Sequence, residues 1–403
     1  MNEFIEAQVR LSWQEARDSY DVVIIGGGGH GLATAYYLAT RYGITNVAVV
    51  ERGYIGSGNS GRNTTVIRAN YGLPESVAFY QRSLELYRGL EAETDRWLMH
   101  NEMGLFWMTH TETGVRQEKM RAKLNTAMGA ITDFVTPEEI HAMCPEIDLE
   151  GGGRYPVLGA SYHPQGATAR HDRVVWALAE GAMRHGVAVL QHRTVTGITM
   201  VGDRVTGVQT DHGPIGAGVI VSCVAGQSTL IADMVGLRLP IRSHPLQAFV
   251  TNHYQRTFNH IVASVDLATY VSQTARGEML IGAEIDRQPS YSYQSSFDFL
   301  QSTAAKASMF LPFLKDLRIL RQWGGVCDMS PDSSPVMGTT GIDGFYISTG
   351  WGTWGFKAIP AGGESMAELV ATGETPDLIK PFRLSRFADD RVLADAGSSG
   401  TQQ

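Results

Sequence analysis

The sequence lacks several features that would place it in other classes of protein. It has only three cysteines in 403 residues, Cys144, Cys223 and Cys327, and none of them forms a CxxC pair. This excludes a disulfide framework and a cysteine zinc site, and it favours a reducing compartment. The longest apolar runs, such as 219–225, fall far short of the roughly 20 residues of a membrane span.

Charge and composition narrow the class further. The net charge of −8 gives no sign of a nucleic-acid-binding protein. The first twenty residues carry several charged side chains and lack the apolar stretch of a secretory signal. Apolar residues at 43% and charged residues at 18% suit a globular enzyme with a large core. We therefore expect a cytoplasmic protein that binds neither nucleic acid nor membrane, and no metal site.

The segment near the N-terminus has the pattern of a βαβ unit. The run 21–25 is almost wholly apolar and rich in β-branched residues, which predicts a strand buried on both faces. The glycine-rich break 26–31 precedes a helical stretch, 32–39, which is expected to end near Gly43. A second buried strand over 47–50 completes the unit.

The glycine-rich break matches the GxGxxG pattern of dinucleotide-binding proteins. Alone the pattern is weak, but here it follows a predicted strand, opens a helix and is answered by an acidic residue after the second strand. The glycines permit a tight turn, backbone approach to a pyrophosphate and close packing of helix on strand, while the acid accepts from ribose hydroxyls. The alternative, a glycine-rich turn in an unrelated α/β fold, is far weaker in this context. The predicted contacts are Gly26, Gly28, Gly29, His30, Gly31 and Glu51.

The middle of the chain has a different pattern. Apolar residues at spacings of three and four predict a helix over 77–98. The runs 104–108 and 248–251 predict strands of an antiparallel sheet. The segment 58–68 is rich in small and amide residues, which suits a loop whose backbone contacts a flat ligand, although an ordinary polar loop fits equally well.

Two later segments return to the character of a nucleotide domain. The run 219–224 predicts a buried strand that leads into a short apolar helix. The run 344–349 predicts another strand, followed by a glycine-rich loop over 350–363 and a helix over 364–372.

Several blocks together resemble one family. The blocks YDVVIIGGGGHGLATAYYLA, GNSGRNTTVIRANY, SHPLQAFV, RQWGG and GWGTWGFKAIPAGG are similar to the β subunit of heterotetrameric sarcosine oxidase, and the likeness runs from Tyr20 to Phe387. That family belongs to the D-amino-acid-oxidase-like flavoproteins, which oxidise N-methyl and other amines of amino acids. The resemblance implies a noncovalent FAD, a second flavin (FMN) joined through a histidine, a larger α-type subunit and small subunits.

The resemblance also implies a fold and a division of the chain. We expect an α/β protein with a glutathione-reductase-like FAD-binding domain and an interleaved substrate domain built on an antiparallel sheet. The expected parts are an N-terminal arm (1–19), an FAD-binding domain (20–90, 165–235 and 335–387), a substrate domain (91–164 and 236–334) and a flexible tail (388–403).

Residues near the second flavin follow from the same resemblance. His171 occupies the position of the family's flavinylated histidine, Arg170 stands where the family has a lysine near the FMN, and Arg321 matches a residue near the FMN. From the residues alone, His171 is better explained as a polar residue before a helix that Asp172 caps.

Two cations are the expected partners of a substrate carboxylate. Arg68 and Lys357 match family positions near the flavin, and arginine and lysine both bind carboxylates. Without the resemblance, each is more simply a solvated surface cation. The remaining expected cofactor contacts are Asn59, Ser60, Thr64, Val66, Val195, Gly352, Gly355 and Lys357 itself.

The sequence departs from the family in two respects. Asp266 and Ala268 replace histidines of the closest family members, which puts the FMN contact in doubt. Trp354 stands where the family usually has glycine, so the pocket near the FAD is expected to be reshaped. Cys327 lies near the cysteine that carries covalent FAD in related monomeric enzymes, but not at it, and receives no such role.

The function that these features imply is oxidative demethylation of sarcosine or a similar secondary amino acid. Hydride would pass to FAD, and electrons would then pass to the FMN. The alternatives are an FAD dehydrogenase for another secondary amino acid such as N-methylglutamate or proline, a glycine-oxidase-like enzyme that acts alone, and a non-catalytic flavin-binding subunit.

Overall fold

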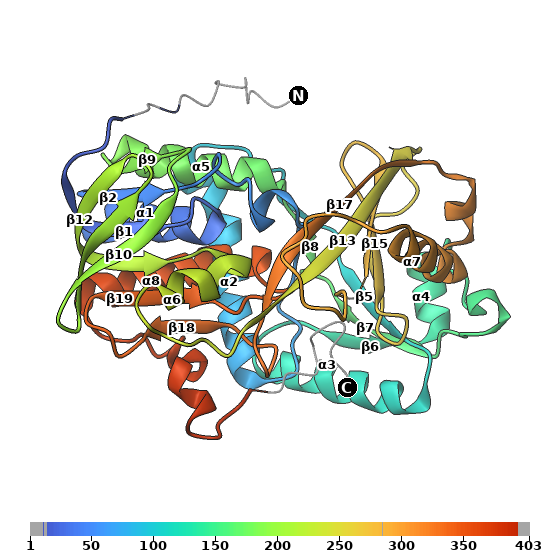
Figure 1. The fold of residues 1–403 in the computed structure, drawn as a ribbon. Helices are drawn as coiled ribbons and strands as arrows, with labels where there is room; N and C mark the ends of the chain where they lie inside the picture. Colours follow the sequence, from blue (N-terminus) through green and yellow to red (C-terminus); the bar gives the residue numbers. More distant parts are fainter. Residues whose placement is uncertain (1–10, 12–13, 284, 394–403) are drawn as a thin grey trace.

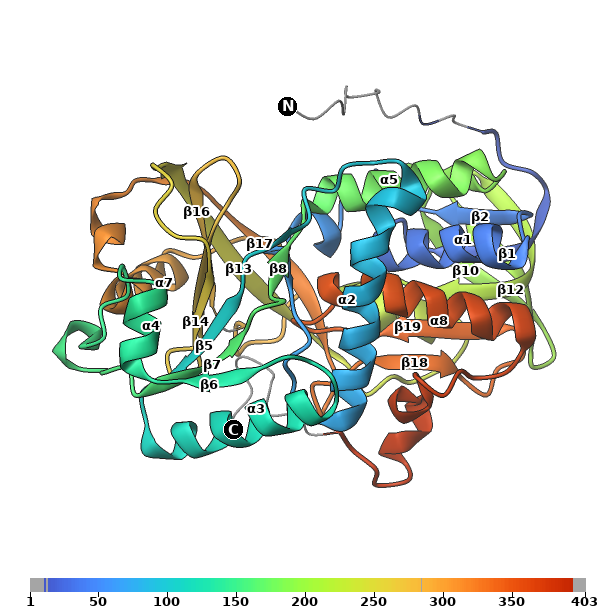
Figure 2. The ribbon, with the colours of Figure 1, turned by 180° about the vertical axis from the view of Figure 1, so that it is seen from behind.

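The structure is a computed structural model that describes residues 11, 14–283 and 285–393. Figures 1 and 2 show two lobes side by side, one with α1, α5 and α8 around a sheet and the other with α3, α4 and α7 around a second sheet. Across the described ranges, no helix combines the length and hydropathy that crossing a bilayer requires.

The first sheet contains the predicted βαβ unit. Strands β1 and β2 are parallel neighbours, with Val23 opposite Ala48, and α1 connects them. Gly43 ends α1 in the left-handed conformation, as the sequence predicts. The strands of this sheet are, in spatial order, β10 (Val195–Val201), β11 (Arg204–Thr210), β12 (Gly213–Ser222), β1 (Ser19–Ile25), β2 (Val47–Val50) and β9 (Ala188–Leu190), with β19 (Phe345–Thr349) beside β12 and β18 (Val336–Thr339) beside β19.

The second sheet forms the other lobe. Its neighbouring strands are antiparallel except for one parallel pair, β5 and β14, where Phe106 lies opposite Val262. The strands are, in spatial order, β17 (Ile319–Met329), β13 (Arg242–His253), β16 (Glu278–Ala283), β15 (Thr269–Gln273), β14 (Ile261–Ser264), β5 (Leu105–Thr109), β7 (Gly159–His163) and β6 (Asp133–Val135). The prediction of an α/β protein with a largely antiparallel second sheet is therefore confirmed.

A small third sheet is made of short strands that lie, along the chain, where it passes from one large sheet to the other. It consists of β3 (Val66–Ile67), β8 (Ala167–Thr168) and β4 (Asn101–Glu102). The first sheet draws its strands from the ranges 19–50, 188–222 and 336–349, and the second from 105–163 and 242–329. The domain boundaries themselves stay a prediction.

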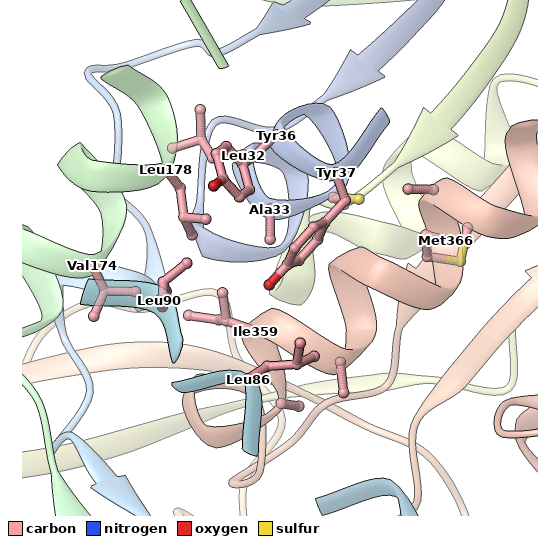
Figure 3. Close-up of a cluster of buried hydrophobic side chains, with 14 of the residues drawn as sticks. Leu32, Ala33, Tyr36, Tyr37, Leu86, Leu90, Val174, Leu178, Ile359 and Met366 are labelled. Carbon is pink, nitrogen blue, oxygen red and sulfur yellow. The ribbon is translucent and has the colours of Figure 1, made fainter. Parts of the chain in front are cut away.

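Helices cover the first sheet and bury its core. Figure 3 shows buried side chains from α1, α2, α5 and α8 gathered into one hydrophobic cluster. The α-helices of the described residues, taken over both lobes, are α1 (Gly29–Tyr42), α2 (Pro74–Thr94), α3 (Glu112–Ala127), α4 (Pro137–Met143), α5 (His171–Arg184), α6 (Ser228–Asp233), α7 (Phe297–Phe310) and α8 (Ile359–Thr372).

Two predicted elements are wrong at their boundaries. The helix predicted over 77–98 is α2, which starts earlier and stops at Thr94 because Asp95 takes the left-handed conformation with φ of 53°. The loop predicted over 350–363 is shorter, because a 3₁₀ turn begins at Phe356 and α8 begins at Ile359. Gly362 and Gly363 therefore lie inside a helix.

The glycines at this place in α8 allow the helix to pack closely on α1. Helix α8 packs on α1, and an added Cβ at Gly363 would lie 2.3 Å from the Cβ of Ala33 and 2.9 Å from the backbone nitrogen of Thr34. The two helices approach this closely only because neither carries a larger side chain there.

Both ends of the chain extend past the described residues. Residues 1–10 and 12–13 of the predicted N-terminal arm, and 394–403 of the predicted flexible tail, lie outside them. Within the tail, the backbone nitrogen of Leu393 donates to the carboxylate of Asp332 at 2.9 Å. That carboxylate also binds Arg386 in a buried ion pair.

We expect Gly363→Ala to lower the free energy of unfolding by about 1–3 kcal/mol, because the new methyl group overpacks the contact between α1 and α8. The matched control is Gly89→Ala in α2, where the nearest atom to an added Cβ is a flexible carboxylate oxygen at 3.5 Å. That change should leave stability equal or raise it, since alanine is the better helix former. Denaturant titrations of both variants make the comparison, and equal stabilities would contradict this account of the packing.

Candidate functional site

A cavity of about 580 Å³ opens between the two large sheets. This volume lies within the roughly 300–1,000 Å³ of small-molecule sites. The predicted residues that line it are Gly26, Gly28, Gly29, His30, Glu51, Asn59, Ser60, Thr64, Val66, Arg68, Val195, Gly352, Gly355 and Lys357.

The three key glycines of the fingerprint have three different environments. Gly26 has a φ of +109°, and an added Cβ would meet the carbonyl oxygen of Cys223 at 2.5 Å. Gly31 does not line the cavity, because an added Cβ would lie 2.0 Å from the carbonyl oxygen of Gly26, inside the helix–strand contact. Gly28 has only the hydroxyl oxygen of Ser60 within 4 Å, at 3.1 Å.

The backbone around Gly28 forms a cradle for an anion. Gly28 precedes α1 with a φ of −82°, which any residue adopts. A glycine at this position therefore leaves room for a ligand and is not required by the backbone conformation. The helix has no side-chain N-cap from Gly28, and the nitrogen of Gly29 donates to Ser60 at 2.9 Å. An open helix N-terminus lined with glycines fits the pyrophosphate of FAD.

Glu51 lines the same cavity at the end of β2. Its carboxylate accepts from the backbone nitrogens of Gly27 and Gly53, at 2.8 Å each. These bonds fix the carboxylate next to the fingerprint, and a carboxylate has about four acceptor sites, so acceptor capacity remains. The role as ribose acceptor stays a prediction.

The segment 58–68 is not an ordinary surface loop. The Asn59 amide joins it to β17, accepting from the nitrogen of Val326 at 2.9 Å and donating to its carbonyl oxygen at 2.5 Å. The hydroxyl of Thr64 lies 2.8 Å from that of Tyr270 on β15. The loop therefore bridges the fingerprint and the second sheet, and its backbone lines the cavity.

His30 connects the fingerprint helix to the loop after β19. Its ring stacks on Trp351 with centroids 4.1 Å apart, and its Nε2 lies 2.9 Å from the carbonyl oxygen of Gly355. Burial lowers the pKa of His30 to about 4, so the ring is neutral at pH 7. Since a carbonyl can only accept, Nε2 carries the proton.

Both predicted carboxylate partners are buried rather than solvated. Arg68 is 4% exposed and Lys357 is 7% exposed, and both line the cavity. The Arg68 guanidinium donates to the carbonyl oxygen of Asn70 at 2.7 Å, and the Lys357 ammonium donates to the carbonyl oxygen of Thr353 at 3.2 Å. Burial, and then the nearby positive charge of Arg68, hold the pKa of Lys357 well below its usual value.

Sequence reasoning missed a buried acid at the cavity wall. The carboxylate of Asp328 accepts from the hydroxyl of Thr349 at 3.0 Å and from the nitrogen of Trp351 at 3.2 Å. Its backbone oxygen accepts from the nitrogen of Gly352 at 3.1 Å, so this residue anchors the loop that leads to Lys357. Burial raises the pKa of Asp328 to about 6. The sequence did contain a signal for this residue, because an acidic side chain next to Cys327 interrupts an otherwise apolar stretch of a strand.

Sequence reasoning also missed five aromatic residues of the cavity wall: Trp107, Tyr270, Tyr293, Trp351 and Phe356. Cys327, which received no covalent role, lines the cavity and is buried, and burial holds the pKa of its thiol well above its usual value. Within the described ranges, no group of three or more histidine, cysteine or acidic residues is arranged to hold a metal ion.

A second cavity, of about 1120 Å³, brings together Arg170, His171 and Arg321. His171 is the first residue of α5, and its Nδ1 is buried without a hydrogen-bond partner among the described residues. Burial lowers the pKa of His171. Asp172 is not the N-cap, since Arg170 takes that place, and it accepts from Arg170 at 2.9 Å instead.

The two departures from the family lie in different places. Asp266 accepts from the backbone nitrogen of His110 at 2.8 Å, and neither it nor Ala268 is among the described residues that line the second cavity. Neither replacement side chain is therefore part of that cavity's wall. Trp354, in contrast, is buried and lines the first cavity, where it alters the wall.

The fold and the first cavity define a class of protein. A strand–GxGxxG–helix–strand unit whose glycine cradle opens into a cavity against an antiparallel sheet defines a dinucleotide-binding oxidoreductase of the flavoprotein kind.

Comparison with known proteins identifies the family. The model of the FAD dependent oxidoreductase family matches residues 21–369. The sarcosine oxidase subunit beta of Arthrobacter sp is 41% identical over 385 residues, which cover 96% of this chain and 95% of the relative. That of Rhodobacter capsulatus is 40% identical over 386 residues, which cover 96% and 93%. The chain belongs to the FAD-dependent oxidoreductase family and, within it, to the sarcosine oxidase β subunits; it is an FAD-dependent amine oxidoreductase.

Solved structures agree with this assignment. An L-proline dehydrogenase from P. horikoshii superposes with a TM-score of 0.88 at 29% identity, covering 94% of this chain and 100% of its own. A glycine oxidase from Bacillus cereus superposes with a TM-score of 0.80 at 22% identity, covering 91% and 99%, and shows the shared fold alone.

We expect Gly28→Val to abolish FAD retention, because the branched side chain would occupy the cradle that the structure leaves open beside Ser60. Absorbance of the purified protein after gel filtration gives the FAD content per chain. The control is Gly197→Val in β10, where an added Cβ makes an ordinary 3.6 Å contact with Gln209 outside the cavity. Stoichiometric FAD in the folded Gly28→Val protein would contradict the assignment of the glycine cradle as the binding site of the FAD pyrophosphate.

Proposed function

We propose that the chain oxidises a small secondary amino acid such as sarcosine, with noncovalent FAD in the first cavity. The observation that carries the proposal is that two buried cations, Arg68 and Lys357, line the same cavity as the dinucleotide fingerprint. When bound, FAD supplies the acceptor for the hydride on the carbon next to the substrate nitrogen. The residues of this chain bind and orient the substrate and set its charge.

The substrate carboxylate would bind Arg68 and Lys357. Arginine can hold a carboxylate through two parallel hydrogen bonds, and lysine adds a third donor with a point charge. The indole nitrogen of Trp107, which also lines the cavity, is buried without a hydrogen-bond partner among the described residues. A buried donor without an acceptor is costly, and a bound carboxylate would satisfy it.

The same cations favour the reactive form of the amine. A secondary amine must lose its proton before hydride can leave the neighbouring carbon, and nearby positive charge lowers the pKa of an ammonium group. Burial of the cavity wall strengthens this effect, since charges interact more strongly away from water. The chain therefore needs no dedicated general base for this step.

We also propose that the second cavity holds FMN, linked covalently to His171. A neutral ring nitrogen is needed for such a linkage, and the unpartnered Nδ1 and lowered pKa of His171 supply one. Arg170 and Arg321, on the same cavity wall, would bind an anionic phosphate group. FMN, when bound, supplies a second electron acceptor.

The open side of the second cavity suits a partner subunit. Its wall includes exposed Tyr54, Trp176 and Leu320, and large apolar side chains are seldom left together at a surface. We propose that a larger α-type subunit covers this cavity in a hetero-oligomer that also has small subunits.

The free, buried cysteines agree with the proposed cytoplasmic location.

A second candidate function is dehydrogenation of another secondary amino acid. The similarity to L-proline dehydrogenase, with a TM-score of 0.88, favours proline among the alternatives. Turnover of sarcosine, N-methylglutamate and proline by the same preparation separates these substrates. Activity without partner subunits would indicate a glycine-oxidase-like enzyme, and FAD that no amine reduces would indicate a non-catalytic subunit.

We expect Lys357→Met and Arg68→Lys each to lower kcat/KM for the best amino-acid substrate far more than they lower FAD content. Loss of a charge-assisted hydrogen bond to a carboxylate costs about 1.5–3 kcal/mol, which is roughly a tenfold to hundredfold effect. Steady-state kinetics and absorbance spectra provide the two measurements. The matched control is Lys380→Met, at an exposed lysine that pairs with Asp377. Wild-type turnover by both cavity variants would rule out the anchoring role.

We expect the co-expressed complex to carry FMN on His171, as measured by mass spectrometry of the peptide that contains it. His171→Asn should carry no covalent flavin and should retain FAD, because the two cavities are separate. His185→Asn, at the other end of α5, is the control and should stay flavinylated. An unmodified His171 peptide from active, fully assembled complex would refute covalent attachment and leave the FAD site standing.

A further inference from the structure

A layer of aromatic rings surrounds the Arg68 guanidinium. The group lies 4.2 Å from the ring centre of Tyr71 and 4.5 Å from that of Trp107. Tyr71 in turn stacks on Tyr80 with centroids 4.2 Å apart. Each of these rings restrains its neighbour, so the guanidinium has little freedom to move away from the cavity.

Trp354 completes this layer and is also part of the cavity wall. Its ring centre lies 4.8 Å from that of Tyr71 and 5.8 Å from that of Tyr80, and it is 2% exposed. It stands three residues before Lys357, and the backbone nitrogen of Trp354 donates to the carbonyl oxygen of Trp351 at 2.8 Å. The indole therefore packs against the ring that contacts the Arg68 guanidinium, and it lines the same cavity as Lys357.

The packing behind Trp354 prevents it from retreating. Tyr71, Tyr80 and Trp354 are all buried, and an interior packed at crystal-like density has no room for a displaced indole. The side chain also has only two torsions, and its backbone is tied to the turn that leads to Lys357. A ligand that needs more room at this place would have to overpack the layer.

We propose that Trp354 is a specificity-determining residue, which limits the substrate to amino acids with small substituents next to the carboxylate-binding cations. This inference rests on the proposed function of the first cavity. N-methylglycine fits the limit, whereas glycines with bulky N-substituents are rejected by contact with the indole. A misfit of one or two methylene groups in a closed pocket changes kcat/KM by roughly tenfold to two hundredfold.

The test compares Trp354→Ala and Trp354→Phe with the wild type in the FAD-loaded protein, in the assembly in which it is isolated. The measured quantity is the ratio of kcat/KM for N-propylglycine to that for N-methylglycine. We expect the ratio to rise at least tenfold in Trp354→Ala and by a smaller factor in Trp354→Phe. The control is Trp97→Ala, which removes an indole that is 46% exposed and packs on Arg173 outside both cavities.

A binding measurement provides a second readout without turnover. Calorimetric titration with acetate and with benzoate gives the ratio of the two dissociation constants, and Trp354→Ala should shift it at least tenfold in favour of benzoate. If Trp354→Ala fails to fold, the same titration of Trp354→Phe decides by a smaller shift in the same direction. Unchanged ratios in folded, FAD-loaded variants would overturn the inference. A wild-type protein that oxidises no secondary amino acid would overturn the proposed function instead.

Discussion

The burial of two basic side chains in the wall of one cavity is the constraint on which the proposed substrate site depends. Arg68 and Lys357 are both buried in the wall of the first cavity, and burial and then the charge of Arg68 lower the pKa of Lys357. Burying like charges together is unfavourable unless an anion joins them. The substrate carboxylate that we propose would offset this cost, and it would link the architecture to the chemistry of amino-acid oxidation.

The fold supplies these charges from distant parts of the sequence. Arg68 follows β3 directly, whereas Lys357 lies in the 3₁₀ turn before α8. Helix α2 connects the two regions, because the hydroxyl of Ser83 donates to the carbonyl oxygen of Lys357 at 2.6 Å and that of Tyr87 donates to the carbonyl oxygen of Phe356 at 2.6 Å. Close packing of α8 on α1 fixes the same turn against the fingerprint. The same packing of α1, α2 and α8 therefore stabilises the core and positions the residues of the site.

Local patterns in the sequence predicted what is locally determined. The βαβ unit, its glycines and Glu51 follow from short-range spacing, and the structure has them in place. The start of α8 could not be predicted the same way, because Gly362 and Gly363 have low helix propensity, and their close contact with α1 is not visible in the local sequence. Asp328 was missed for a similar reason: its partners, Thr349 and Trp351, come from another strand and the loop after it.

The segment 57–65 gives the two cavities a common wall. Ser57, Arg62, Asn63 and Thr65 line both, and Tyr293 joins them from the second lobe. The indole nitrogen of Trp323 donates to the carbonyl oxygen of Arg62 at 2.8 Å, while Asn59 holds the loop to Val326. These bonds join the loop to β17 in the second lobe, at the place where it separates the two cavities. The polar, glycine-rich composition of the segment follows from that position: side chains must bond to strands on one side and leave backbone free to contact ligands on the other.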